Sequence, residues 1–178
     1  MQTVTSRSAM GEPVDHDFDE IFRQHYQLIY RTAFGVTGRS EDAEDVLQTI
    51  FLRLLGRVIP PDLTKNPRAY LYRAAVNVSL NTIRARQRQV QIEDAERLAG
   101  PARLMDPALD HPTRQRLLDA ISRLNSSAVE ILMLRYVHNY SDAEIAKLLG
   151  TTRGTVAVSL YRSRARIRKL MREAGETL

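Results

Sequence analysis

Apolar residues recur every three or four positions along most of this chain, and no segment alternates apolar with polar residues. Such spacing places apolar side chains on one face of an α-helix, whereas a strand would need a period of two. One stripe spans residues 21–36, and a more regular one consists of Ala43, Val46, Leu47, Ile50, Phe51, Leu54 and Val58. The pattern therefore predicts an all-α fold.

Turn and cap residues separate the first three predicted helices. Gly38 is expected to end the first helix, and Ser40 is a candidate N-cap for the second. The proline pair at 60 and 61 ends the second helix, because proline cannot continue a helix interior. Asn66 followed by Pro67 predicts the start of a third helix. Its buried stripe would contain Leu71, Ala74, Ala75, Val78 and Thr82.

Cap residues also divide the C-terminal third of the chain. Residues 125–127 form a cap cluster, in which Ser127 and Glu130 have the spacing of a capping box. A second capping box is predicted at residues 141–144, opening a short helix that stops at Gly150. Thr152 then caps a last, longer helix. These signals predict several short helices in succession.

The charges of this 178-residue chain fall into blocks. Residues 67–88 hold five basic and no acidic side chains, and residues 113–178 hold twelve basic and six acidic ones. Residues 89–112 between them hold two basic and five acidic residues together with three prolines and a glycine. This predicts an N-terminal tail (1–17), a helical domain (18–88), a flexible acidic linker (89–112) and a second helical domain (113–178). The linker is long enough that the two domains need not touch.

Several classes of protein are excluded by what the sequence lacks. The absence of cysteine excludes disulfides, thiol nucleophiles and cysteine-ligated metals. No apolar run approaches the length of a membrane span or forms a signal peptide, which predicts a cytoplasmic protein with no membrane partner. The four histidines are dispersed, and no phosphate-binding glycine loop is present. We therefore expect no enzyme activity, no cofactor and no metal.

Residues 141–166 have the pattern of a helix-turn-helix. A short capped helix ends at a glycine, and a second helix begins with small hydroxyl residues and is rich in arginine. In that motif the second helix enters the major groove of DNA, where its first residues meet base edges. The residues expected to face DNA are Thr152, Arg153, Thr155, Ser159 and Arg162, and those expected nearer to phosphates are Arg164, Arg166, Arg168 and Lys169.

A second polar face follows the predicted helix that starts at Pro67. It carries two amides and three guanidiniums at spacings of three and four residues, namely Arg73, Asn77, Asn81, Arg84 and Arg88. Clustered guanidiniums neutralise phosphate, so the chain has two separate basic surfaces for a polyanion.

Two blocks of sequence resemble one known family. DAEDVLQTIFLRL (residues 42–54) and PRAYLYRAAVNVSLNTIRARQR (67–88) are similar to domain 2 of bacterial sigma-70 factors, and residues 124–166 are similar to domain 4. With these two domains and no third between them, the chain resembles an extracytoplasmic-function (ECF) sigma factor. The resemblance implies a subunit that directs RNA polymerase to promoters.

The resemblance assigns a role to each surface. The helix around residues 42–54 would bind the clamp of the largest subunit of core RNA polymerase, through Glu41, Asp45, Gln48 and Leu52. Domain 4 would contact the second-largest subunit and read the −35 element, with Arg166 among its contacts. Residues 70–88 would read and open the −10 element, through Tyr70, Arg73, Asn77, Asn81, Arg84 and Arg88, with Arg86 on phosphate and Tyr70 or Tyr72 stacking on a base. An anti-sigma factor is a further expected partner.

The sequence departs from the family at the start of the last helix. After Val156 the family often has Lys-Ser-Arg, whereas this chain has Ala157, Val158 and Ser159. This loss of two basic groups shifts the expected base reading toward Arg153, Ser159 and Arg162. The alternative function is that of a helix-turn-helix regulator that binds DNA without polymerase, which would leave residues 41–52 and 73–88 without a role.

Overall fold

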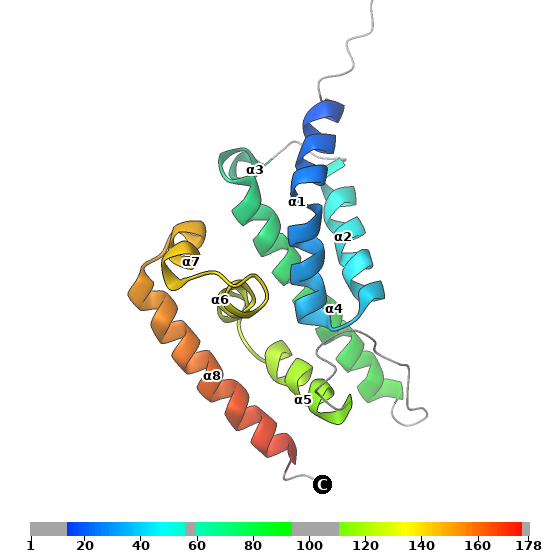
Figure 1. Ribbon diagram of the computed structural model, residues 1–178. Helices are drawn as coiled ribbons and strands as arrows, with labels where there is room; N and C mark the ends of the chain where they lie inside the picture. The colour runs from blue at the N-terminus through cyan, green and yellow to red at the C-terminus, as the bar shows by residue number, and fades with distance from the viewer. Residues whose placement is uncertain (1–13, 56–59, 94–110, 176–178) are drawn as a thin grey trace, which may run out of the picture.

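Eight helices form in the residues that the computed structural model describes, 14–55, 60–93 and 111–175 (Figure 1). These residues contain helices and turns but no strand, as the sequence predicts. The helices are α1 (Val14–Thr37), α2 (Ser40–Leu55), α3 (Pro61–Lys65), α4 (Pro67–Glu93), α5 (His111–Ser122), α6 (Ser126–Tyr136), α7 (Asp142–Leu149) and α8 (Arg153–Gly175).

The first domain is a bundle of α1, α2 and α4, with the short α3 beside α4. Its apolar cluster contains Ile29 and Ala33 from α1, Val46 and Ile50 from α2, and Leu71 from α4. These side chains are the stripes that the periodicity predicts. The predicted stripe of α2 is buried from residue 43 to 51, whereas Val58 lies outside the described residues.

The turns around these helices follow their local sequence, with one exception. Gly38 has a φ of +71° and ends α1, a conformation that glycine adopts without steric cost. The Asn66 side chain accepts a hydrogen bond from the Ala69 amide (3.0 Å) and so caps α4 as predicted. The prediction that Ser40 caps α2 is wrong, because the carbonyl of Arg39 already accepts the first helical bond, from Ala43 (3.1 Å).

The second domain consists of α5 to α8, and one of its predicted caps is also wrong. Asn125 caps α6, since its side chain accepts from the Ala128 amide (2.8 Å). Ser127 is exposed, and Glu130 is buried beside Arg73 of α4, so these two residues form no capping box. The asparagine therefore takes the cap position two residues earlier than predicted.

The two domains pack against each other through α4. Its apolar side chains Tyr72, Val76 and Leu80 belong to the cluster that holds the core of α5 to α8. The predicted stripe beginning at Leu71 accounts for only one side of α4, because the other side becomes buried when the second domain covers it. Figure 1 shows α6 lying between the first bundle and the long α8.

The region predicted to be a linker is partly helical where it is described. Helix α4 continues to Glu93, and α5 starts at His111, both inside the predicted range 89–112. Residues 94–110, like the first thirteen residues of the predicted tail, lie outside the described residues. In the described part of the chain, no helix has the length and the hydropathy needed to cross a membrane.

Candidate nucleic-acid interface

Helices α7 and α8 form the predicted helix-turn-helix. The Ser141 amide donates to the Glu144 carboxylate (2.8 Å), and the Glu144 amide donates to the Ser141 hydroxyl (3.3 Å), which completes a capping box. Hydrogen bonds from Ser141 also hold the pKa of Glu144 below its usual value. Gly150 ends α7 with a φ of +69°, and Thr152 accepts from the Thr155 amide (3.1 Å) at the start of α8. The local sequence thus fixes where α7 begins and ends and where α8 begins.

Removing the first of these caps has a predictable cost. We expect Ser141→Ala to lower the free energy of unfolding by about 1 kcal/mol, because the Glu144 amide loses its acceptor and the Glu144 carboxylate loses the hydroxyl donor. Urea unfolding followed by circular dichroism measures the change. Ser127→Ala is the matched control and should change the stability by a few tenths of a kcal/mol at most, since Ser127 is exposed and no cap. An equal cost for both substitutions would contradict these cap positions.

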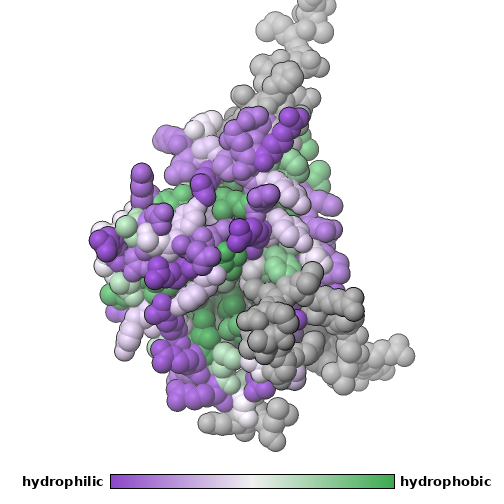
Figure 2. All heavy atoms as spheres, viewed as in Figure 1, coloured by the Kyte–Doolittle hydropathy of each residue, from purple (hydrophilic) through white to green (hydrophobic). Residues whose placement is uncertain are grey.

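The outer face of α8 is exposed and basic. Residues 153–172 contain seven basic side chains and no acidic one. Figure 2 shows hydrophilic side chains along the edge of the molecule where α8 lies, and hydrophobic ones toward its interior. Ser159 is half-buried, and the other predicted −35 residues are exposed, namely Thr152, Arg153, Thr155, Arg162 and Arg166. Two apolar side chains that were not predicted to face DNA, Val158 and Tyr161, are exposed among them.

The polar face of α4 is only partly open. Asn77, Asn81 and Arg88 are exposed. Arg73 donates to the carbonyl of Leu149 at the end of α7 (2.8 Å), and Arg84 donates to the carbonyls of Ser122 (3.0 Å) and Leu124 (2.9 Å) after α5. Carbonyls at a helix C-terminus lack partners within the helix and carry partial negative charge. In this arrangement two of the arginines predicted to bind phosphate therefore cap helices of the second domain.

The two tyrosines of α4 have different environments. Tyr72 is fully buried, and its hydroxyl donates to the backbone carbonyl of Glu130. Burial raises the pKa of Tyr72 well above its usual value. Tyr70 is half-buried against the first core and lines a cleft of about 700 Å³ between the two domains. Arg73 and Asn77 line the same cleft, as does the end of α7.

The exposed face of α2 carries the residues predicted to bind polymerase. Glu41, Asp45, Gln48 and Leu52 are all exposed, and Leu52 keeps 68% of its surface accessible. Leu55 continues the same face one turn later and is 55% exposed. The sequence reasoning missed Leu55, although its spacing from Leu52 is the signal that would have found it.

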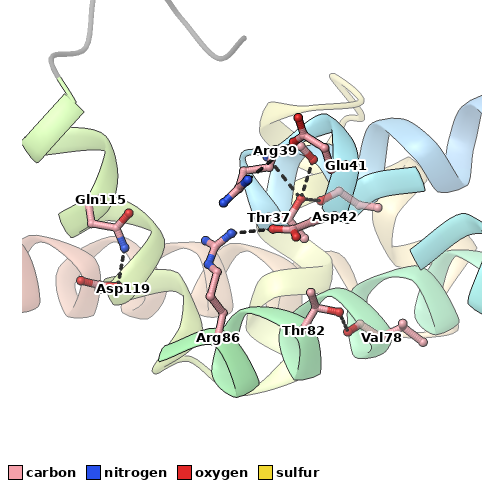
Figure 3. A network of polar contacts seen from close by, with 10 residues as sticks. Thr37, Arg39, Glu41, Asp42, Val78, Thr82, Arg86, Gln115 and Asp119 are labelled. Carbon is pink, nitrogen blue, oxygen red and sulfur yellow. Dashed lines mark hydrogen bonds and ion pairs between the residues drawn. The ribbon is translucent and has the colours of Figure 1, made fainter. Parts of the chain in front are cut away.

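An ion pair joins this helix to α4. Arg86 donates to the carboxylate of Asp42 (2.5 Å), and Glu41 lies 3.7 Å from Arg39 (Figure 3). The predicted phosphate contact of Arg86 is therefore replaced here by a contact within the first domain. Figure 3 also shows Asp119 of α5, which accepts a hydrogen bond from Gln115 (3.2 Å). The same carboxylate oxygen accepts a second bond, from Gln87 of α4 (2.8 Å).

The turn after α6 is held by the first domain. His138 is half-buried, and its Nε2 lies 2.8 Å from the hydroxyl of Thr32. The Thr32 hydroxyl donates to the carbonyl of Leu28 (2.7 Å), so Nε2 must be the donor to Thr32. Burial, together with the nearby positive charges of Arg31 and Arg68, lowers the pKa of His138 to about 4. The histidine is thus neutral at pH 7.

No group of three or more potential metal ligands occurs in the part of the chain that the structure describes. Exposed guanidiniums and amides on α4 and α8 suit nucleic acid, and the mixed acidic and apolar face of α2 suits a protein. The class defined by this geometry is a two-domain, helix-turn-helix DNA-binding protein with a separate exposed face that is acidic and apolar.

Comparisons with known proteins identify the family. Residues 21–89 match Sigma-70 region 2, and residues 114–167 match Sigma-70 region 4. The RNA polymerase sigma-E factor of Streptomyces antibioticus is 33% identical over 90% of this chain and 87% of its own length. The ECF RNA polymerase sigma factor SigW of Bacillus subtilis is 25% identical over 88% of this chain and 89% of its own length.

A solved structure has the same fold. The sigma factor RpoE of Bartonella quintana, in complex with the anti-sigma factor NepR, is 21% identical with a TM-score of 0.52, over 88% of this chain and 97% of its own. The chain belongs to the sigma-70 family, in its ECF group, and is an RNA polymerase sigma factor. That family consists of transcription initiation factors, which favours this function over a regulator acting without polymerase.

Proposed function

We propose that three surfaces of this sigma factor divide the work of promoter recognition. The exposed face of α2 binds the clamp of the largest subunit of core RNA polymerase. The polar face of α4 binds the −10 element, and α8 reads the −35 element. The observation that carries the proposal is the pair of basic helices, one in each domain, with an acidic and apolar face on a third helix.

The −10 contacts are proposed to combine amides and guanidiniums. Asn77 and Asn81 are exposed one turn apart, so their amides can bond the pairing edge of an unstacked base. Arg88 is exposed and has no polar partner among the described residues, so it can hold phosphate, while Arg73 and Arg84 must leave the carbonyls of the second domain to do so. Phosphate oxygens accept from the same guanidinium donors as carbonyls, and bind them more strongly. DNA binding by α4 is therefore coupled to separation of the two domains.

The −35 contacts are proposed to come from the N-terminal half of α8. Thr152, Arg153 and Thr155 lie in its first turn, where a recognition helix meets base edges. Ser159 and Arg162 follow on the next turns. Arg166 lies further along, where contact with phosphate is expected.

Partners beyond DNA follow from the same surfaces. The second domain is proposed to rest on the second-largest polymerase subunit, and an anti-sigma factor is proposed to cover α2 or α4 when the protein is inactive. Transcription initiation places the protein in the cytoplasm. The contacts with the largest and the second-largest polymerase subunits are both proposed.

The polymerase contact is tested by a double variant. We expect Asp45→Arg with Gln48→Ala to weaken binding to core polymerase about tenfold, because a new cation and a shortened side chain lie at the centre of the face. Pull-down with purified core polymerase measures the change. Glu20→Arg with Gln27→Ala is the matched control on exposed positions of α1 and should bind normally. If the α2 variant binds core polymerase as well as the wild type does, the exposed face of α2 is not the polymerase-binding surface.

Promoter-specific initiation is tested directly. Core polymerase lacking any sigma factor is incubated with this chain and genomic DNA from its source, and the 5′ ends of the transcripts are sequenced. We expect defined start sites that share upstream elements at −35 and −10. Transcripts without defined starts would contradict the proposed function.

A further inference from the structure

Val158 is an apolar side chain exposed in the middle of the recognition helix. It is 47% exposed, and Tyr161, one turn later, is 72% exposed. The buried side of α8 is formed by Val156, Leu160 and Ser163, which pack on the rest of the second domain. With about 3.6 residues per turn, Val158 lies on the opposite side of the helix. Core packing therefore does not explain a valine here.

Cationic side chains share the outer side of α8 with Val158. Arg162 lies one turn after Val158 and Arg166 two turns after it, close to the same side of the helix, whereas Arg153 lies nearer to the buried side. All three are exposed, and the structure gives none of them a polar partner among the described residues. Guanidiniums next to this face can hold the phosphates that border a major groove, and Val158 then points to the groove floor.

The residue one turn before Val158 supports a close approach from outside. A Cβ atom added to Gly154 would meet no atom of this protein nearer than the Thr152 hydroxyl, at 3.9 Å. The fold thus has room for alanine, which would stabilise a helix better than glycine. A glycine that the fold does not need is expected where another molecule comes close to the backbone.

We propose that Val158 reads a thymine of the −35 element through van der Waals contact with its C5-methyl group. An isopropyl group has no hydrogen-bond donor or acceptor, so it cannot bond a base edge. The methyl of thymine is the apolar group that unmodified DNA presents in the major groove. Because Val158 stands where the resemblance places a serine in the family, this contact would give the chain a −35 preference of its own. The inference rests on the proposed role of α8.

The test removes the methyl group alone. Holoenzyme assembled from core polymerase and the full chain first selects its −35 element from duplexes randomised in that region. Each dT of the selected element is then replaced by dU, which lacks only the methyl. We expect at least one position where dU lowers the affinity of the wild-type holoenzyme about three- to fivefold, the effect of losing one buried methyl contact. Val158→Ala should bind dT and dU duplexes equally.

Two further variants separate this contact from general binding. Arg166→Ala should lower affinity for dT and dU duplexes by the same factor, as a phosphate contact does. Gly154→Ala should weaken both about tenfold without lowering the thermal midpoint of the free protein, because its Cβ has room in the fold but not against DNA. An undiminished dT preference in Val158→Ala would overturn the proposal, as would a selected element without a methyl-sensitive thymine.

Failure of the proposed function gives a different result. If α8 does not read the −35 element, the selection yields no enriched sequence, and the role of Val158 falls with it. If an element is enriched but no thymine responds to loss of its methyl, the −35 function stands and only the role of Val158 is rejected. A Val158→Ala variant that binds every duplex like the wild type would assign the exposed valine to a protein partner instead.

Discussion

Replacing Tyr72 by alanine is expected to lower the free energy of unfolding by about 3–5 kcal/mol. Tyr72 has no exposed surface and lies in the cluster shared by the two domains. Its ring packs edge-on against His138, with centroids 6.0 Å apart, and its hydroxyl donates to the carbonyl of Glu130. The substitution leaves a cavity where α4 meets α6. Urea unfolding followed by circular dichroism measures the loss.

Two control variants separate the cavity from the hydrogen bond. Tyr72→Phe keeps the ring and should cost only about 0.5–1.5 kcal/mol, the effect of losing one hydrogen bond. Tyr70→Ala removes a half-buried tyrosine from the first domain alone and should cost less than Tyr72→Ala. Equal costs for the two alanine variants would show that α4 is not buried by the second domain in solution.

Acidification from pH 7 to pH 5 is expected to remove about 1–2 kcal/mol of stability through His138. The pKa of His138 is lowered to about 4 in the fold, against about 6.5 in an unfolded chain. The folded state therefore binds fewer protons, so the stabilisation is complete above pH 6.5 and is lost as the pH falls toward 4. Protonation would place a third cation beside the guanidiniums of Arg31 and Arg68.

The neighbouring groups decide how this effect is measured. Tyr72 and Tyr140 contact the His138 ring, and the raised pKa of Tyr72 keeps its hydroxyl neutral in this range. Burial raises the pKa of Glu130, so its protonation favours the folded state at low pH and offsets the effect. Burial also lowers the pKa of His25, which adds to the loss in every variant. Unfolding should therefore be compared between pH 7 and pH 5 in wild type and in His138→Gln.

The glutamine variant isolates the histidine. It keeps an N–H donor for Thr32 but has no titratable group, so its stability should fall by about 1–2 kcal/mol less than that of the wild type. The same fall in both proteins would assign the acid sensitivity to other groups. If the wild type loses less stability between pH 7 and pH 5 than the glutamine variant does, the His138 ring is solvated and the turn after α6 does not pack on the first domain.

Features that depend on neighbouring residues along the chain were predictable. The stripe of α2, the asparagine cap of α4, the capping box of Ser141 and the glycine stops all depend on residues a few positions apart. Hydrogen bonds and side-chain contacts over one helical turn are local, so their pattern is visible in the sequence. The two wrong caps, at Ser40 and Ser127, are off by one and two residues, because α2 begins directly after Arg39 and α6 directly after Asn125.

Features that depend on distant residues were not predictable. From the sequence, Arg73, Arg84 and Arg86 were all predicted to bind phosphate, because the residue type does not show which acceptor a guanidinium contacts. The structure instead gives them a carbonyl of α7, two carbonyls after α5 and a carboxylate of α2. Likewise, the second buried side of α4 exists only because α6 covers it. The exposure of Leu55 and Val158 was not predicted, because the sequence alone does not show whether a given apolar side chain is buried.

The sequence by itself thus determined the helices, the division into two domains, the helix-turn-helix and the family, since periodicity, caps and charge blocks are properties of the chain. Only the tertiary structure decided which faces remain exposed and which arginines are already paired. Those outcomes depend on how the second domain packs on α4. That packing is a sum of contacts between residues far apart in the chain, such as Tyr72 with Glu130 and Thr32 with His138.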